Sequence, residues 1–236
     1  MSALIIFDLD GTLADTEYEI AAMTADMAQA EGFELDAATA FRRYAGASFK
    51  DKFNMIAAEA GRSFTPERLA DLHEDYKTRK RTLYKNPDIP AIPGAKSLVS
   101  RLSVDPNLTL SVGSSNERCR TRTVLSNIGL SQYFNDRVFG SDMTDGRKKP
   151  DPSIFHLAMA GHDPGETLVV EDSLVGITAA HAAGAFVVAY LDPRTVDRSE
   201  REQAYRDAGA DMIIDNYDHF EEQVSKNWAG WPHPAP

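Results

Sequence analysis

Short apolar runs alternate with helical segments along most of this chain. Each run is followed by turn residues, a pattern typical of buried strands. We predict strands at residues 3–8, 108–113, 137–140, 167–171, 186–190 and 211–214. We predict helices at 94–103, 116–129, 152–161, 174–183, 198–208 and 217–227. Alternating strands and helices favour a parallel sheet covered by helices on both faces.

The first predicted strand is separated from the others by a block without strand patterns. Residues 16–32 have apolar side chains at helical spacing, and further helical segments are predicted at 37–45, 48–60 and 66–84. Prolines at 87, 90 and 93 then predict a linker or hinge after this block. We therefore predict an α/β protein: a Rossmann-like parallel-sheet core (1–15 and 87–236) with an inserted all-helical cap domain (16–86). The Pro-rich tail WAGWPHPAP predicts poor order.

Charge and composition exclude several classes of partner. The net charge of −11 and the absence of a Lys/Arg stripe argue against nucleic acid. No apolar stretch approaches the roughly 20 residues that span a bilayer, so we expect no membrane partner. The single cysteine, Cys119, cannot form an internal disulfide, which favours a cytoplasmic protein. A monomer and a small homo-oligomer are both compatible with the sequence.

Acidic residues follow two of the predicted strands. Asp8 and Asp10 end the first strand, and Glu171 and Asp172 end the fourth. Alternate strand residues point the same way, so Asp8 and Asp10 can share a face. The carboxyl ends of parallel strands form the ligand-binding edge of such sheets. Carboxylates gathered there need a cation, and an all-oxygen set without a His or Cys cluster suits Mg²⁺ rather than zinc.

Donors for an anion are found at the same predicted edge. Ser114, Ser115 and Asn116 open a predicted helix with Asn116 or Ser115 as its N-cap, and the serine hydroxyls and free backbone N–H groups there could bind a phosphate. Lys149 adds a positive charge, and the proline after it favours an extended conformation. Its neighbour Lys148 is predicted to lie on the surface. Alternatively, Asp8 and Asp10 only form a turn, and the serines only cap the helix.

Four ordered motifs resemble those of the haloacid dehalogenase (HAD) superfamily. They are DLDGT with Asp8 and Asp10, the GSSN turn with Ser114, KKPDPSIF with Lys149, and VVEDS with Glu171 and Asp172. The resemblance spans essentially the whole chain, including a helical cap after the first motif. It is strongest with the β-phosphoglucomutase and sugar-phosphate phosphatase branch.

The resemblance implies a role for each of these residues. Asp8 would be the nucleophile that forms an aspartyl-phosphate, and Asp10 the general acid and base. Ser114 and Lys149 would bind the phosphate, with help from Ser115. The magnesium ligands would be Asp8, the Asp10 carbonyl and Asp172, with Glu171 nearby.

The implied activity is Mg²⁺-dependent hydrolysis of a small phosphorylated metabolite, a phosphate monoester such as a sugar phosphate. The alternatives are phosphoryl transfer, as in β-phosphoglucomutase, and a non-catalytic binding module. The sequence G46-A-S48-F49 has Phe49 where the mutases carry an Arg, which favours hydrolysis. Candidate cap residues for substrate specificity are Glu17, Arg43, Phe49, Lys50 and Lys77.

Overall fold

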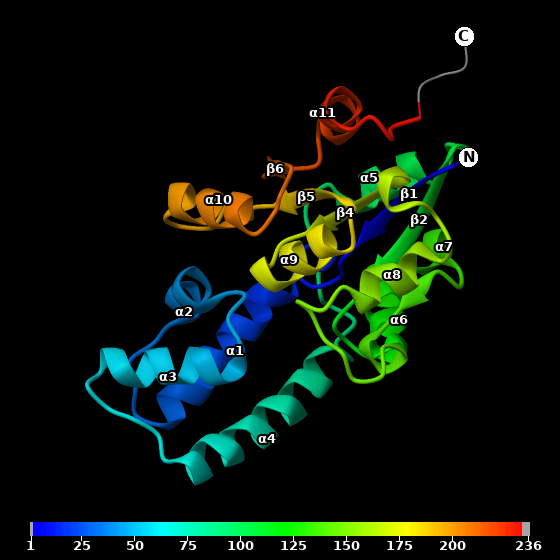
Figure 1. The fold of residues 1–236 in the computed structure, drawn as a ribbon. Helices are drawn as coiled ribbons and strands as arrows, with labels where there is room; N and C mark the ends of the chain where they lie inside the picture. The colour runs from blue at the N-terminus through cyan, green and yellow to red at the C-terminus, as the bar shows by residue number, and fades with distance from the viewer. Residues whose placement is uncertain (1, 233–236) are drawn as a thin grey trace. The chain divides into compact units, whose positions relative to one another are not determined.

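The computed structural model describes residues 2–232, so the end of the Pro-rich tail lies outside the described residues. The chain divides into two compact units (Figure 1). One comprises Asp15–Pro87, and the remaining described residues form the other, which we call the core. These bounds differ by one residue from those predicted for the cap. We call the Asp15–Pro87 unit the cap.

The core contains a parallel sheet, and the described residues place six strands in it. The strands are β1 (Ala3–Phe7), β2 (Leu108–Gly113), β3 (Val138–Phe139), β4 (Thr167–Glu171), β5 (Phe186–Tyr190) and β6 (Met212–Ile214). Their order is β3-β2-β1-β4-β5-β6, and every pair is parallel. The predicted strands are confirmed. The strand order reverses beside β1, which lies between β2 and β4, so a ligand crevice is expected at its carboxyl end.

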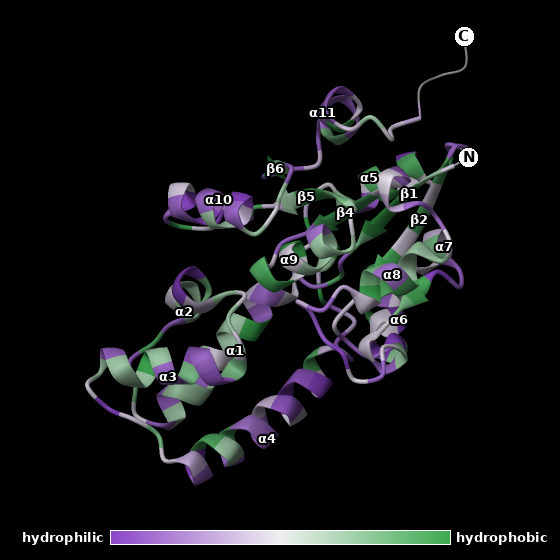
Figure 2. Cartoon of the chain, in the orientation of Figure 1, coloured by the Kyte–Doolittle hydropathy of each residue, from purple (hydrophilic) through white to green (hydrophobic). Residues whose placement is uncertain are grey.

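Apolar side chains on both faces of the sheet explain the strand pattern. Every residue of β1 is buried, and Figure 2 shows the strands as mainly hydrophobic. On one face, Ile6 belongs to the same apolar cluster as Phe155 and Ile177. Phe7 points to the other face and packs edge-on against Phe134, with ring centroids 6.3 Å apart. Burial on both faces therefore holds β1 at the centre of the core.

The core helices follow the predicted alternation with small shifts at their ends. They are α5 (Ala95–Leu102), α6 (Arg118–Asn127), α7 (Ser131–Phe134), α8 (Ser153–Met159), α9 (Leu174–Ala182), α10 (Arg198–Asp207) and α11 (Phe220–Asn227). The short helix α7 was not predicted. Helices α8 and α9 supply much of the apolar cluster that covers one sheet face.

The cap is helical throughout its regular structure, as predicted. Its helices are α1 (Thr16–Ala30), α2 (Ala37–Tyr44), α3 (Phe49–Glu59) and α4 (Pro66–Leu83). The side chains of Asp36, Ser48 and Thr65 cap the last three by accepting a backbone N–H. A cluster that includes Ile20 and Phe53 forms part of the apolar interior.

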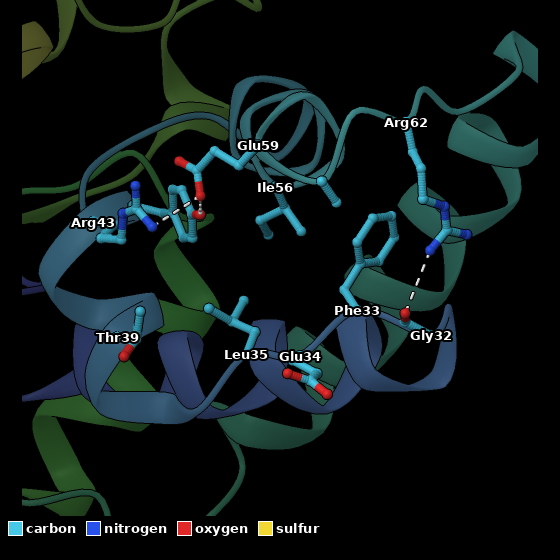
Figure 3. Close-up of a pocket in the computed structure, with 11 residues that line it drawn as sticks. Gly32, Phe33, Glu34, Leu35, Thr39, Arg43, Ile56, Glu59 and Arg62 are labelled. Carbon is cyan, nitrogen blue, oxygen red and sulfur yellow. Dashed lines mark hydrogen bonds and ion pairs between the residues drawn. The ribbon is translucent and has the colours of Figure 1, made fainter.

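A pocket of about 440 Å³ lies in the cap between α2, α3 and the 32–35 turn (Figure 3). Phe33 and Ile56 are among its apolar lining residues. The candidate Arg43 lines it too, and its guanidinium is 3.0 Å from the Glu59 carboxylate. The Tyr44 hydroxyl also donates to Glu59, at 2.6 Å. Arg43 is thus paired within the cap.

The other cap candidates have varied surroundings. Glu17 accepts the Gly46 N–H at 3.2 Å. Phe49 stacks on His73, with ring centroids 4.6 Å apart. Lys50 is exposed, and Lys77 forms an ion pair with Glu74 at 2.7 Å. Their roles in substrate specificity stay predictions.

One cap lysine that the sequence did not single out is buried. Lys52 on α3 is 4% exposed. Burial lowers the pKa of its ammonium, partly offset by the charge of Glu17. Within the described residues, no helix is both long and apolar enough to cross a bilayer.

Candidate active site

The turn after β1 presents Asp8 and Asp10 at the carboxyl edge of the sheet. The Asp8 N–H continues the sheet by donating to Val170 O at 2.9 Å, and Asp8 is 6% exposed. The chain then turns tightly, because Gly11 N–H donates to Ala14 O at 2.9 Å. Gly11 has a φ of +77°, a conformation that side chains other than hydrogen disfavour. Strand β1 therefore ends at Phe7, one residue before the predicted end, and the tight turn around Gly11 follows after Asp8 and Leu9.

Lys149 joins the ends of β1 and β4. Its ammonium lies 2.5 Å from Asp8 Oδ1 and 2.6 Å from Glu171 Oε1. The Lys149 side chain is 3% exposed, and the nitrogen lies 4.8 Å from the centre of the Phe155 ring. Lys148 is exposed. The surface position predicted for Lys148 is confirmed, and the phosphate-binding role of Lys149 stays a prediction.

Glu171 is held at the beginning of α9 by three contacts. One oxygen binds Lys149, and the other accepts the Ser173 N–H at 2.7 Å and the Ser173 hydroxyl at 2.9 Å. Gly176 makes room for this carboxylate, because a Cβ there would lie 1.7 Å from Glu171 Oε1. Glu171 thus orients Lys149 in this structure, and its role near a metal stays a prediction.

Asp172 lies against the turn that follows β1. The Thr12 hydroxyl donates to Asp172 Oδ1 at 3.2 Å. A Cβ on Gly11 would lie 2.1 Å from Asp172 Oδ2, so only glycine permits this approach. The Tyr205 hydroxyl donates to the Asp172 carbonyl. The first and fourth motifs, distant in sequence, therefore meet at one point.

Asn116 reaches Asp10 instead of capping a helix. Its side-chain Nδ2 donates to Asp10 Oδ2 at 2.5 Å. Helix α6 begins at Arg118, and its N-cap is Glu117. The prediction that Ser115 or Asn116 caps this helix is wrong, because the helix begins later and the Asn116 side chain donates to Asp10 in the turn after β1.

The rest of the 114–118 turn is arranged around that contact. Ser114 is buried, and its Oγ accepts the Asn116 N–H at 3.1 Å. Ser115 is exposed. The Arg118 N–H donates to Asp142 at 2.7 Å, so this first-turn amide of α6 binds a protein carboxylate. Ser114 and Asn116 are therefore brought to the site, and the phosphate-binding roles of Ser114 and Ser115 stay predictions.

Burial and charge act against each other on the central ion pair. Burial raises the pKa of Asp8, Lys149 lowers it, and Glu171 and Asp10 raise it again, to about 7 in total. Burial would lower the pKa of Lys149, but Asp8 and Glu171 outweigh it and raise that pKa. The site thus holds more carboxylates than the single ammonium neutralises.

The oxygen donors at this edge of the sheet suit the predicted metal, Mg²⁺. Among residues 2–232, no three His, Cys, Asp or Glu side chains lie close enough together to hold a metal ion unaided. The residues at the edge are oxygen donors with an excess of negative charge. They fit Mg²⁺, which usually keeps several waters and takes only one or two carboxylates. The Asp10 carbonyl and a substrate phosphate can supply further oxygens.

A family model for haloacid dehalogenase-like hydrolases matches residues 5–190. The chain belongs to this family. The matched range begins in β1 and ends with β5, so it includes the inserted cap and all the site residues from Asp8 to Asp172.

Relatives of this HAD hydrolase include named phosphatases. Phosphoglycolate phosphatase of Mesorhizobium japonicum is 31% identical over 205 residues, which are 84% of this chain and 86% of the relative. The 6-phosphogluconate phosphatase of Escherichia coli is 28% identical over 183 residues, 76% of this chain and 78% of the relative. The CBBY-like protein of Arabidopsis thaliana is 30% identical over 155 residues, 64% of this chain, but the match spans only 48% of that protein.

Solved HAD structures share the fold. A haloacid dehalogenase-like protein of Agrobacterium tumefaciens has a TM-score of 0.79 and 27% identity, covering 96% of this chain and 99% of the other. A HAD family hydrolase of Deinococcus radiodurans, with bound phosphate and sodium, has a TM-score of 0.73 and 25% identity, covering 99% of both chains.

Proposed function

We propose that this HAD hydrolase is a Mg²⁺-dependent phosphatase that hydrolyses a small phosphate monoester, such as a sugar phosphate, through an aspartyl-phosphate on Asp8. The observation that carries the proposal is the buried Lys149 ammonium between Asp8 and Glu171, beside the reversal of strand order. The named phosphatases among the relatives support the same reaction class.

The first half-reaction places a carboxylate nucleophile next to a fixed positive charge. An Asp8 oxygen attacks phosphorus, and the bond from phosphorus to the ester oxygen breaks. Asp10 gives its proton to the departing oxygen. Lys149 neutralises part of the charge that repels a phosphate from Asp8, and Ser114 donates a hydrogen bond to the phosphate.

The second half-reaction regenerates the enzyme. A water oxygen attacks the phosphorus of the aspartyl-phosphate, and the bond to the Asp8 oxygen breaks. Asp10 takes a proton from that water, which returns both carboxyl groups to their starting states. Asp8, the Asp10 carbonyl and Asp172 would hold Mg²⁺, which supplies charge stabilisation for the transferring phosphoryl group.

The direct test is phosphate release from p-nitrophenyl phosphate and a panel of sugar phosphates. We expect release with Mg²⁺, loss of activity with EDTA, and recovery when Mg²⁺ is restored. Activity that is unaffected by EDTA would contradict the proposed Mg²⁺ dependence. No phosphate release from any substrate would contradict the proposed phosphatase activity.

A second experiment separates hydrolysis from phosphoryl transfer. The protein is incubated with β-glucose 1-phosphate, and both free phosphate and glucose 6-phosphate are measured. We expect no glucose 6-phosphate at any time point. Its formation faster than phosphate release would identify a mutase and overturn the proposal.

A further inference from the structure

The Asn116 side chain joins the end of β2 to the turn after β1. Its Nδ2 lies 2.5 Å from Asp10 Oδ2, and Asn116 is 6% exposed. An amide NH₂ group only donates hydrogen bonds, so Asp10 Oδ2 must be the acceptor. This hydrogen bond is partly buried, and a hydrogen bond to a carboxylate is among the stronger polar contacts in a protein and restricts the orientation of both groups.

The backbone of Asn116 is held by two hydrogen bonds, so its side-chain amide extends from a fixed position. Its N–H donates to Ser114 Oγ at 3.1 Å, and its carbonyl accepts the Ser141 N–H at 2.8 Å. Gly140 allows this close approach, because a Cβ there would lie 2.7 Å from the Asn116 carbonyl oxygen. The loop after β3 therefore supports the loop after β2, and little conformational freedom remains to be lost when Asn116 binds Asp10.

From this geometry we propose that Asn116 is a positioning residue for Asp10, an inference that rests on the proposed phosphatase reaction. Asn116 occupies Oδ2 and fixes the plane of the Asp10 carboxyl group, so that Oδ1 carries the transferred proton. The same hydrogen bond is compatible with both forms of Asp10, because Oδ2 accepts whether or not Oδ1 is protonated.

Each half-reaction then uses Oδ1 in one fixed orientation. In the first, the Oδ1 proton moves to the ester oxygen as the bond from Asp8 to phosphorus forms and the ester bond breaks. In the second, Oδ1 takes a proton from the attacking water as the bond from Asp8 to phosphorus breaks. The sum is ester plus water giving alcohol plus phosphate.

This assignment differs from the role that the sequence predicted for Asn116. A phosphate ligand would be needed equally for every substrate and every step. A positioning residue for Asp10 is needed only where a proton moves. p-Nitrophenolate leaves without protonation at neutral pH, so with p-nitrophenyl phosphate only the second half-reaction depends on Asp10.

The experiment measures both half-reactions of Asn116→Ala with p-nitrophenyl phosphate and Mg²⁺ by stopped flow. We expect a burst of p-nitrophenolate at close to the wild-type rate, followed by a steady state about 10- to 100-fold slower. This loss is smaller than the full contribution of acid–base catalysis, roughly 100- to 10,000-fold, because Asp10 itself is still present. Aspartyl-phosphate should accumulate to nearly one equivalent, measured by intact mass. Asn116→Ser, which keeps a small polar residue in the turn, should behave alike. Glu117→Gln, on the exposed side of the turn, should leave both phases unchanged.

A double-mutant cycle with Asp10→Ala decides between positioning and other roles. If Asn116 acts through Asp10, Asn116→Ala slows Asp10→Ala by less than about 2-fold. The inference is overturned if Asn116→Ala slows the burst and the steady state equally. It is also overturned if Asn116→Ala slows the Asp10→Ala variant as much as it slows the wild-type protein. The proposed function fails separately, if no phosphate is found on Asp8 in wild type or in these variants.

Discussion

The ammonium of Lys149 lies 2.5 Å from Oδ1 of Asp8, although 141 positions separate the two residues in the chain. Both side chains are buried, so each depends on the other for its charge to be tolerated.

We expect Lys149→Met to leave Asp8 and Glu171 with an uncompensated buried charge. The free energy of unfolding should fall by about 3 kcal/mol, the usual cost of breaking a buried pair, and phosphate release should be lost with it. Urea denaturation measures the first and the substrate panel the second. Lys148→Met is the matched control, because Lys148 is exposed. A similar loss of stability in both variants would contradict the buried pair.

Asp8→Asn should abolish turnover while the protein stays folded. An amide is a far weaker nucleophile than a carboxylate, so kcat should fall by at least about 1,000-fold. Lys149 keeps Glu171 as its partner in this variant. Circular dichroism checks the fold and phosphate release the rate. Asp145→Asn removes an exposed carboxylate and should retain full activity. Turnover by Asp8→Asn would exclude Asp8 as nucleophile.

Gly176→Ala should destabilise the protein, against the usual effect of this change inside a helix. Alanine ordinarily stabilises a helix interior relative to glycine by about 1 kcal/mol. Here the added Cβ would lie 1.7 Å from Glu171 Oε1. Displacing that carboxylate should lower the free energy of unfolding by about 1 to 3 kcal/mol and disturb Lys149. Thr178→Ala, at an exposed position of α9, should change stability little. Stabilisation by Gly176→Ala would refute the packing described.

The free energy of unfolding should increase as the pH rises, because the pKa of Lys52 is lowered in the folded state. Burial lowers its pKa in the folded state, so between that pKa and the unfolded value of about 10.4 the unfolded chain binds more protons. Stability therefore increases with pH across that window. Lys52→Met should remove this dependence and raise the free energy of unfolding by about 1 kcal/mol or more. Urea denaturation from pH 7 to pH 10 measures both effects. The exposed Lys50→Met should show neither, and an unchanged pH dependence in Lys52→Met would contradict the assignment.

The sheet and the polar residues that gather at its edge could be predicted because both patterns are local in sequence. Most strands are short runs of mainly apolar residues, and Asp8, Lys149 and Glu171 stand at or directly beside strand ends or a proline. The contact between Asn116 and Asp10 could not be predicted, because the same residue type suits a helix cap and a hydrogen bond to a side chain far away in the sequence. Its partner Asp10 lies 106 positions away, and only the folded sheet brings the two together.

The cap was harder to interpret for a related reason. Its sequence contains several exposed cations that look alike, and helical periodicity does not show which of them have partners. Arg43 and Lys77 are paired with Glu59 and Glu74. Lys52 is set apart only by its burial, which depends on packing between helices.

The two core segments that flank the cap in the sequence are joined to each other. Ala14 forms a bridge with Ala91, and the Ile92 N–H donates to Leu13 O at 2.9 Å. This closure has a consequence for folding. Strand β1 must find β2 across residues 8–107, a long loop whose closure costs entropy. If the cap folds first, its ends come together early and most of that loop is already closed. A folded cap would then leave a closing loop about as short as a linker between residues 14 and 88 would, so replacing the cap by such a linker should change the rate of sheet formation little.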